Sequence, residues 1–450
     1  MQNSIPKKSR CLLSWMCAAG FVVSAVSSAQ ELVPAASEPQ NRRDAAESVP
    51  IDAKSVLIVP RPLLSIEKLG RAPLSNYGSL EPIVQALRAH RPLDLNSEMW
   101  HTEHPDANYE VWARKARALL ADGLSYDPGQ LELKATTIAR WETDDFVRET
   151  IEFNTTPWFR VPGYFYIPKN VPLPVPALVV FHEWGGPMLF GADRISGEPV
   201  HEAIVKHREN TTSGRAIADW YATQGYAVIV IDAYHFGHRA PRGVGGLPDS
   251  YDPATLDTET LNRYDGKVRD LLYTGVRELN WAGTTWAGIN YGDDMRCIDY
   301  LLSRSEVDPD RIGCTGLSGG GWRTNILTAL DPRIKAAVSV GWMTTGDSQQ
   351  VYNLSGAVGT FCLLPGVWNR IDIPDLMAMA APKAVMVVSG TEDRLFPPMG
   401  QREAARQIEA AFTWAGCPER FRNYAPPKPH CYDAEIQTEA LAWFDQHLKN

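Results

Sequence analysis

Short apolar runs alternate along the chain with longer segments of helical periodicity. Runs without polar alternation occur at residues 177–182, 227–232, 312–317, 336–342 and 383–389. Such runs are typical of strands that are buried on both faces, and helix-length segments separate most of them. This rhythm of strand, helix and strand predicts an α/β fold with a mostly parallel central sheet flanked by helices.

Upstream of this region, residues 57–168 predict a helical and antiparallel-strand extension. Apolar residues recur at helical spacing between about Leu80 and Leu124. Three strand-like runs follow, and polar and apolar residues alternate in the second, which favours a half-exposed antiparallel meander leading into the sheet. The runs cover residues 131–141, 146–153 and 158–167. The chain closes with a predicted amphipathic helix whose apolar face carries Ile436, Ala440, Phe444 and Leu448.

Two insertions break the rhythm, at about 187–214 and 243–282. Both follow the carboxyl ends of predicted strands, where parallel sheets bind their ligands. We therefore expect them to form the walls or lid of a pocket.

The sequence Gly316-Leu317-Ser318-Gly319-Gly320 directly follows one apolar run and precedes a helical segment. A serine held on a sharp turn from strand to helix is exposed to a base and to backbone N–H groups. Small flanking residues allow the strand and helix to approach closely. The pattern predicts that Ser318 is a nucleophile and that the amide of Gly319 helps to form an oxyanion hole.

An acid and a histidine follow in the order that such a serine requires. Asp393 comes just after the apolar run that ends at Ser389, and His430 lies in a proline-rich loop before the closing helix. The sequence predicts a triad of Ser318, Asp393 and His430, in which the imidazole transfers the proton and the carboxylate orients it. Glu392 and Asp347 are competing carboxylates.

The string His182-Glu183-Trp184-Gly185 follows another predicted strand. With the triad order and Asp232, it resembles the dienelactone hydrolase branch of the α/β-hydrolases, including secreted bacterial proteins described as acetyl xylan esterase-like. The likeness extends from about Gly163 to the C-terminus. It implies an α/β-hydrolase catalytic domain over 169–450, an esterase activity, and a second oxyanion amide from Trp184.

Two departures limit the resemblance. Dienelactone hydrolases of the small type carry a cysteine nucleophile that a glutamate helps to activate, whereas this chain has Ser318, so a catalytic role for Glu183 does not follow. Glucuronoyl esterases place Arg directly after the serine, where this chain has Gly319, and that interpretation is disfavoured. Glu183, Trp281 and Trp342 are candidates for substrate binding, although each tryptophan is equally compatible with a place in the core.

The 44 basic and 53 acidic residues give a net charge of −9, which argues against a nucleic-acid partner. Residues 1–29 have the basic start, apolar run and small-residue cleavage site of a signal peptide, and 30–56 predict a flexible linker. An exported periplasmic or extracellular protein without a membrane span after signal removal is therefore expected. Five cysteines would remain, so at least one is unpaired within the chain.

We expect no metal, because the His-containing motifs near residues 101–104 and 235–238 lack a third ligand at the sequence spacing typical of metal sites. No nucleotide-binding glycine loop is complete, so no cofactor is implied. The sequence thus predicts a serine carboxylic-ester hydrolase that acts through an acyl-enzyme on a small-molecule or oligosaccharide ester. A serine peptidase of the prolyl-oligopeptidase kind and a non-catalytic envelope protein of the same fold remain alternatives.

Overall fold

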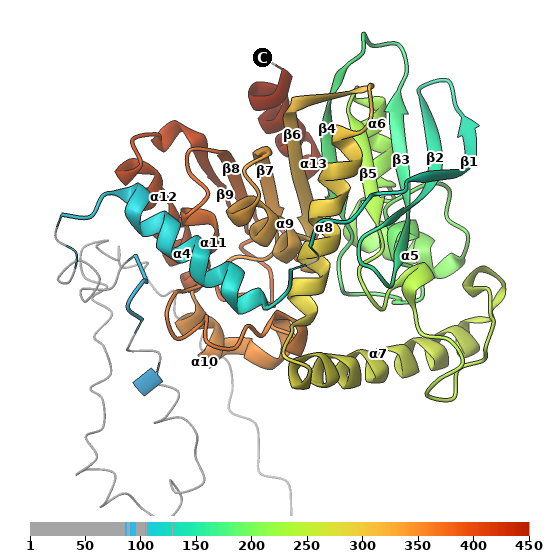
Figure 1. Ribbon diagram of the computed structural model, residues 1–450, viewed down its shortest axis with the longest axis horizontal. Helices are drawn as coiled ribbons and strands as arrows, with labels where there is room; N and C mark the ends of the chain where they lie inside the picture. Colours follow the sequence, from blue (N-terminus) through green and yellow to red (C-terminus); the bar gives the residue numbers. More distant parts are fainter. Residues whose placement is uncertain (1–85, 88–90, 96–103, 105, 128, 450) are drawn as a thin grey trace, which may run out of the picture. The chain divides into compact units, whose positions relative to one another are not determined.

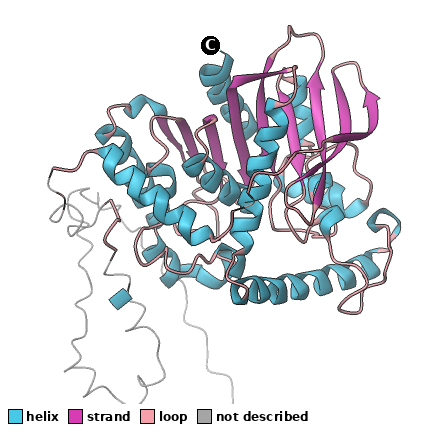
Figure 2. Ribbon diagram, viewed as in Figure 1, coloured by secondary structure: helices cyan, strands magenta, loops and turns pink. Residues whose placement is uncertain are grey.

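The computed structural model describes residues 86–87, 91–95, 104, 106–127 and 129–449. The predicted signal peptide and linker, and much of the helical segment expected before residue 106, lie outside the described residues. Figure 1 shows a central sheet with helices packed on it, and Figure 2 separates the two kinds of element by colour.

Within the described residues, nine strands form one sheet in the order β1-β2-β3-β5-β4-β6-β7-β8-β9. Neighbours from β5 to β9 in this order run parallel, whereas β1, β2, β3 and β5 pair antiparallel. The prediction of a mostly parallel α/β sheet with an antiparallel meander is confirmed. The strands are β1 Thr136–Glu142, β2 Phe146–Asn154, β3 Arg160–Pro168, β4 Val175–Phe181, β5 Ala227–Ile231, β6 Val307–Leu317, β7 Ile334–Val340, β8 Ala384–Val388 and β9 Phe421–Tyr424.

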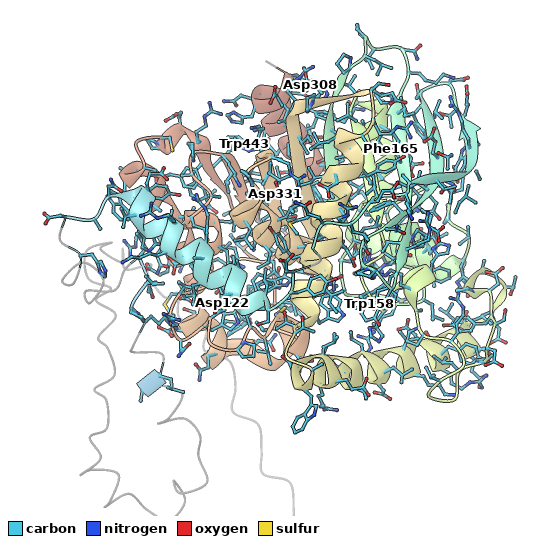
Figure 3. All side chains as sticks on the ribbon, viewed as in Figure 1. Asp122, Trp158, Phe165, Asp308, Asp331 and Trp443 are labelled. Carbon is cyan, nitrogen blue, oxygen red and sulfur yellow. The ribbon has the colours of Figure 1, made fainter. Side chains whose placement is uncertain are left out.

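Strands β1 and β6 begin at other positions than the sequence suggests. β1 starts at Thr136 rather than 131. β6 starts at Val307, and its pairing with β4 is irregular between Val307 and Ile312 because the intervening segment contains Pro309. Asp308, labelled in Figure 3, lies at the amino end of β6, away from the carboxyl edge of the sheet.

Alternate residues of the buried strands pack on opposite layers of helices. Leu178 and Val180 of β4 join the core cluster that includes α6 (Ile217–Thr223) and α13 (Ala434–Phe444). Val179 and Phe181 join the cluster that includes α8 (Trp286–Leu302). Because both faces are covered, the strand shows no polar alternation, which explains the continuous apolar run in the sequence.

Side-chain caps and apolar stripes account for the main helices. Asn108 caps α4 (Tyr109–Leu124), and Asp433 caps α13, where each accepts a hydrogen bond from a backbone N–H of the first turn. The predicted apolar face of the closing helix is buried, including Leu448 in the π-helical segment that follows α13. The helices are α4 Tyr109–Leu124, α5 Glu202–Thr211, α6 Ile217–Thr223, α7 Thr258–Trp281, α8 Trp286–Leu302, α9 Gly319–Leu330, α10 Gly346–Ala357, α11 Asp375–Ala378, α12 Pro398–Trp414 and α13 Ala434–Phe444.

The two insertions contain helices of their own. The first holds a short 3-10 turn, η2 (Ala192–Arg194), and α5. The second holds the long helix α7, which Figure 1 shows crossing beyond the carboxyl ends of the strands. Among the described residues, no helix combines the length and apolar character needed to cross a membrane.

Candidate active site

Ser318 lies between β6 and α9 in a conformation that is rare for a residue with a side chain. Its φ is 57° and its ψ is −115°. Its backbone N–H donates to the carbonyl of Val340 at the end of β7, at 2.8 Å. Backbone strain of this kind persists only where the surrounding structure imposes it, and it concentrates at functional sites.

The glycines around Ser318 are required by close backbone approaches. A Cβ atom at Gly316 would lie 2.7 Å from the Cα atom of Gly320 and from the carbonyl oxygen of Phe181. A Cβ atom at Gly320 would lie 2.5 Å from that same oxygen. Side chains at either position would push α9 away from the sheet, so the turn depends on both glycines.

His430 and Asp393 form a hydrogen-bonded pair beyond the neighbouring strands. The imidazole Nδ1 and the carboxylate Oδ2 are 2.6 Å apart. Asp393 is 4% exposed, and its other oxygen accepts the backbone N–H of Leu395 at 2.8 Å. The carboxylate therefore fixes one imidazole nitrogen and leaves Nε2 for a partner on the other side.

The loops that carry the pair are bonded to each other. The backbone N–H of Glu392 donates to the carbonyl of Lys428 at 3.1 Å. A Cβ atom at Gly390 would lie 2.3 Å from that carbonyl oxygen, so the contact needs a glycine. Farther along, the hydroxyl groups of Tyr432 and Thr315 are 3.0 Å apart, which ties the histidine loop to β6, the strand that Ser318 follows.

Strand β7 links the pair to the serine. Gly341 follows Val340, the residue whose carbonyl holds the amide of Ser318. A Cβ atom at Gly341 would lie 3.0 Å from Cε1 of His430, so the imidazole rests on this glycine. Ser318 and His430 thus contact consecutive residues of one strand end.

The competing carboxylates have other surroundings. Glu392 is exposed. Asp347 has a side chain that is 70% exposed and pairs with Arg91 at 2.8 Å. Of the three carboxylates considered from the sequence, Asp393 is the one that the structure brings to His430.

Trp184 packs directly on the residue after the serine. A Cβ atom at Gly319 would lie 2.1 Å from Cδ2 of Trp184. The indole is nearly buried, and its ring meets Trp286 edge-on at 5.6 Å between centroids. The two residues from which the sequence predicts oxyanion amides are therefore neighbours, and no side chain fits at position 319 without moving the indole.

The three candidates for substrate binding lie in three different environments. Glu183 is buried, and its carboxylate contacts His207 and lies 3.6 Å from Nη1 of Arg194. Trp281 ends α7 with 95% of its surface exposed. Trp342 is buried against Trp322, with 4.5 Å between ring centroids.

Trp342 also forms part of the wall of a cavity of about 330 Å³. Most of its lining residues belong to the crossover from β7 to β8, and neither Ser318 nor His430 is among them. The ring of Phe396 lies near both Trp342 and His430, with its centroid 6.1 Å from the ring of Trp342 and 6.3 Å from that of His430. The other lining residues are Leu87, Arg91, Gly346, Gln349, Gln350, Val358, Cys362, Leu363, Trp368, Asn369, Asp372 and Ile373.

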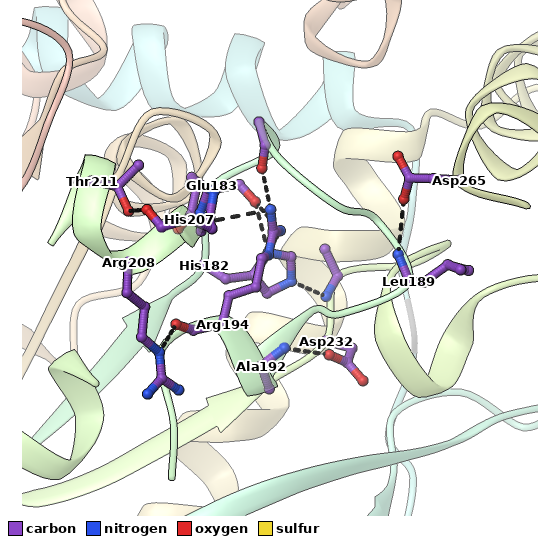
Figure 4. Close-up of polar contacts among 12 residues, drawn as sticks. His182, Glu183, Leu189, Ala192, Arg194, His207, Arg208, Thr211, Asp232 and Asp265 are labelled. Carbon is purple, nitrogen blue, oxygen red and sulfur yellow. Dashed lines mark hydrogen bonds and ion pairs between the residues drawn. The ribbon is translucent and has the colours of Figure 1, made fainter. Parts of the chain in front are cut away.

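Sequence reasoning missed the polar cluster behind the loop of Trp184. Arg194 and His207 from the first insertion meet His182 and Glu183 there, as Figure 4 shows. Although burial alone would raise it, Arg194 and His207 hold the pKa of Glu183 below its ordinary range. No motif marks Arg194 or His207, because their contacts with His182 and Glu183 depend on how the insertion folds.

The described part of the chain holds no group of three or more His, Cys, Asp or Glu side chains arranged to bind a metal ion. All five cysteines expected in the mature chain are described, buried and unpaired.

A family model with the description "Abhydrolase family" matches residues 70–441. The chain belongs to this family. A Bacillus subtilis (strain 168) protein, YtaP, whose name gives it provisionally as a hydrolase, is 24% identical over 321 residues, which are 71% of this chain and 95% of that protein. These findings confirm the α/β-hydrolase resemblance and the general class of hydrolase.

Solved structures show the same fold at low identity. A Bacteroides fragilis NCTC 9343 protein described provisionally as an acetyl xylan esterase is 18% identical, with a TM-score of 0.58 over 78% of this chain and 82% of its own. A glucuronoyl esterase from Solibacter usitatus is 14% identical, with a TM-score of 0.54 over 79% of this chain and 97% of its own. At these identities the likeness establishes the fold.

Proposed function

We propose that the protein is an exported serine carboxylic-ester hydrolase that works through an acyl-enzyme. The observation that carries this proposal is the strained turn at Ser318 beside the bonded pair of Asp393 and His430. A serine forced into this conformation next to an orientated imidazole is the arrangement that nucleophilic acyl transfer requires.

In the proposed reaction, Nε2 of His430 takes the hydroxyl proton as Ser318 attacks the ester carbonyl. The amides of Gly319 and Trp184 stabilise the negative charge on the carbonyl oxygen. The imidazolium then donates its proton to the departing alkoxide, and water repeats the sequence to release the acid. Asp393 fixes the imidazole tautomer and stabilises its charged form.

The position of the cavity bears on the substrate. The leaving oxygen must lie near His430, whereas the carbonyl oxygen must point towards Gly319 and Trp184. We therefore assign the cavity beside Trp342 to the alcohol half of the ester, and its aromatic wall suits the face of a sugar ring or an aromatic ring. The resemblance to acetyl xylan esterase-like proteins supports an esterified plant polysaccharide as the substrate.

Activity of a Ser318→Ala protein tests the proposal. With p-nitrophenyl acetate, we expect turnover to fall about 10⁵- to 10⁶-fold, because the triad acts as a unit. A fluorophosphonate probe should label the wild-type protein at Ser318 and leave the variant unlabelled. Unchanged hydrolysis by the variant would refute the assignment of the nucleophile.

A substrate panel then separates the classes. Acetylated xylo-oligosaccharides, aryl esters and lactones should be compared with p-nitroanilide peptides under the same conditions. Cleavage of the peptides in preference to the esters would favour a peptidase, and absence of both labelling and hydrolysis would favour a non-catalytic binding protein. Recovery of the chain from the periplasm or medium with its first 29 residues removed would support export.

A further inference from the structure

Arg194 reaches from the first insertion into the loop that follows β4. Its side chain is completely buried. Nη1 donates to the carbonyl oxygen of Gly185, and Nη2 donates to that of Glu183. One guanidinium thus holds the carbonyl groups of the two residues that flank Trp184. Figure 4 shows Arg194 beside His182 and Glu183.

His182 acts on the same carbonyl. The backbone N–H of Ala233 donates to Nε2 of the imidazole at 3.0 Å, so in the neutral ring the proton resides on Nδ1. Nδ1 lies 2.8 Å from the carbonyl oxygen of Glu183 and, in this tautomer, donates to it. Nη2 of Arg194 lies 2.8 Å from the same Nδ1, but both nitrogens carry protons, so they share the carbonyl as acceptor and do not bond each other. Burial and the charge of Arg194 lower the pKa of His182 to about 3, which keeps the ring neutral. The carbonyl of Glu183 therefore accepts two hydrogen bonds.

This carbonyl determines where the next amide points. In a trans peptide the C=O of one residue and the N–H of the following residue point in opposite directions. The bond between Glu183 and Trp184 is not among the cis peptides of the described chain. Fixing the oxygen of Glu183 thus fixes the direction of the N–H of Trp184. We propose that Arg194 is a positioning residue that holds the Trp184 amide in place as an oxyanion donor, an inference that rests on the proposed function.

The remaining contacts stabilise this arrangement. Glu183 supplies a buried counter-charge for Arg194, and its carboxylate also contacts His207 of α5. Arg208 of α5 donates from Nε to the carbonyl of Arg194 at 2.7 Å and from Nη1 to that of Gly197 at 2.8 Å. Glu183 is accordingly the counter-ion of Arg194, and the first insertion carries the residues that hold the loop of Trp184.

The test compares Arg194→Lys and Arg194→Gln with the wild-type enzyme, each normalised to active sites titrated with a fluorophosphonate. Lysine keeps the charge beside Glu183 but has one nitrogen and cannot bond both carbonyls in fixed geometry. We expect kcat to fall about 10²- to 10³-fold in the glutamine variant, as for the loss of one oxyanion donor, with KM changed less than about threefold. The lysine variant should lose at least about tenfold.

The inhibition constant Ki of a trifluoromethyl ketone is a measurement that would not change if the role of Arg194 were purely structural. Such an inhibitor forms a tetrahedral oxyanion on the serine, so its Ki should rise by about the same factor by which kcat/KM falls. Arg304→Gln serves as the matched control, because Arg304 pairs with Glu149 at 2.7 Å and Glu306 at 2.8 Å near the amino end of β6. This control should lower thermal stability without changing kcat or Ki per active site.

Three outcomes would overturn the inference. The first is a kcat per active site within about threefold of wild type in both Arg194 variants, judged against the 10²-fold effect of an oxyanion donor. The second is an unchanged Ki for the ketone. The third is failure of both variants to fold by circular dichroism, which would make Arg194 a folding residue. A wild-type enzyme that neither hydrolyses esters nor reacts at Ser318 would instead refute the proposed function.

Discussion

The two sides of Ser318 are held by different kinds of interaction. On the side of Trp184, buried charged and polar groups bind the backbone of the loop through several hydrogen bonds. On the side of His430, the imidazole has one strong bond, to Asp393, and otherwise rests on a glycine and an aromatic ring, with 23% of its side chain exposed.

The difference matches what each side has to do in the proposed reaction. A backbone dipole stabilises developing charge best when it needs no reorganisation, so it benefits from a rigid, dry support. A base must take a proton from one oxygen and deliver it to another, which calls for a defined tautomer and some freedom of the ring. Three expected effects, given in decreasing order of size, would sharpen or break this comparison.

The largest effect is expected on the imidazole side. Asp393→Asn should lower kcat about 10⁴-fold, because the amide no longer selects the tautomer or stabilises the imidazolium. Steady-state kinetics with p-nitrophenyl acetate measures the loss. Glu392→Gln is the control, since it changes the adjacent exposed carboxylate and should leave kcat unaltered. Equal losses in the two variants would contradict the assignment of the acid.

On the oxyanion side, Gly319→Ala should lower kcat about 10²-fold. The new methyl group would overlap the indole of Trp184, where 2.1 Å is available, so the loop must shift away from the serine. Gly266→Ala on exposed helix α7 provides the control, because a Cβ atom there meets nothing within 4 Å. A variant of Gly319 with full activity would show that the loop tolerates displacement and is not a rigid support.

The smallest effect concerns stability in acid. Burial lowers the pKa of His182 to about 3, below the value of about 6.5 for an unfolded chain. The neutral ring of His182 has no effect on the pH dependence of stability above pH 6.5. As the pH falls from 6.5 towards 3, stability is lost, because the unfolded chain binds a proton at His182 and the folded chain does not. The free energy of unfolding should fall by up to about 1.4 kcal/mol per pH unit from this residue.

Urea titrations between about pH 4 and pH 6 measure that slope in the window set by these pKa values. His182→Gln should reduce it by one proton, whatever the overall stability of the variant. An unaltered slope in the His182 variant would mean that the ring is protonated in the folded protein.

Much of the fold could be predicted from local patterns. The strands β2, β5 and β8 begin within one residue of the runs predicted from the sequence, since burial on one or both faces leaves a direct trace in hydropathy. The start of β6 could not be predicted, because Asp308 and Pro309 resemble a turn. They nevertheless lie within the strand, in the irregular stretch between Val307 and Ile312, which both pair with β4. Long-range register decides such positions.

The candidate site divides in the same way. Ser318 is marked by its glycines, and Asp393 and His430 follow in a recognisable order, so short motifs are enough to propose them as a triad. Trp281 shows the limit of composition, since an aromatic residue suited to a sugar is fully exposed at the end of α7. Arg194 could not be found from a motif, because the carbonyl groups to which it donates come into contact with it only in the folded chain.

The end of β7 has a mechanical consequence for thermal motion. It carries the carbonyl that holds the amide of Ser318 and, one residue later, the glycine under His430. Any displacement of that strand end carries both groups in the same direction. Their separation is therefore buffered against fluctuations of the sheet that would move either of them alone.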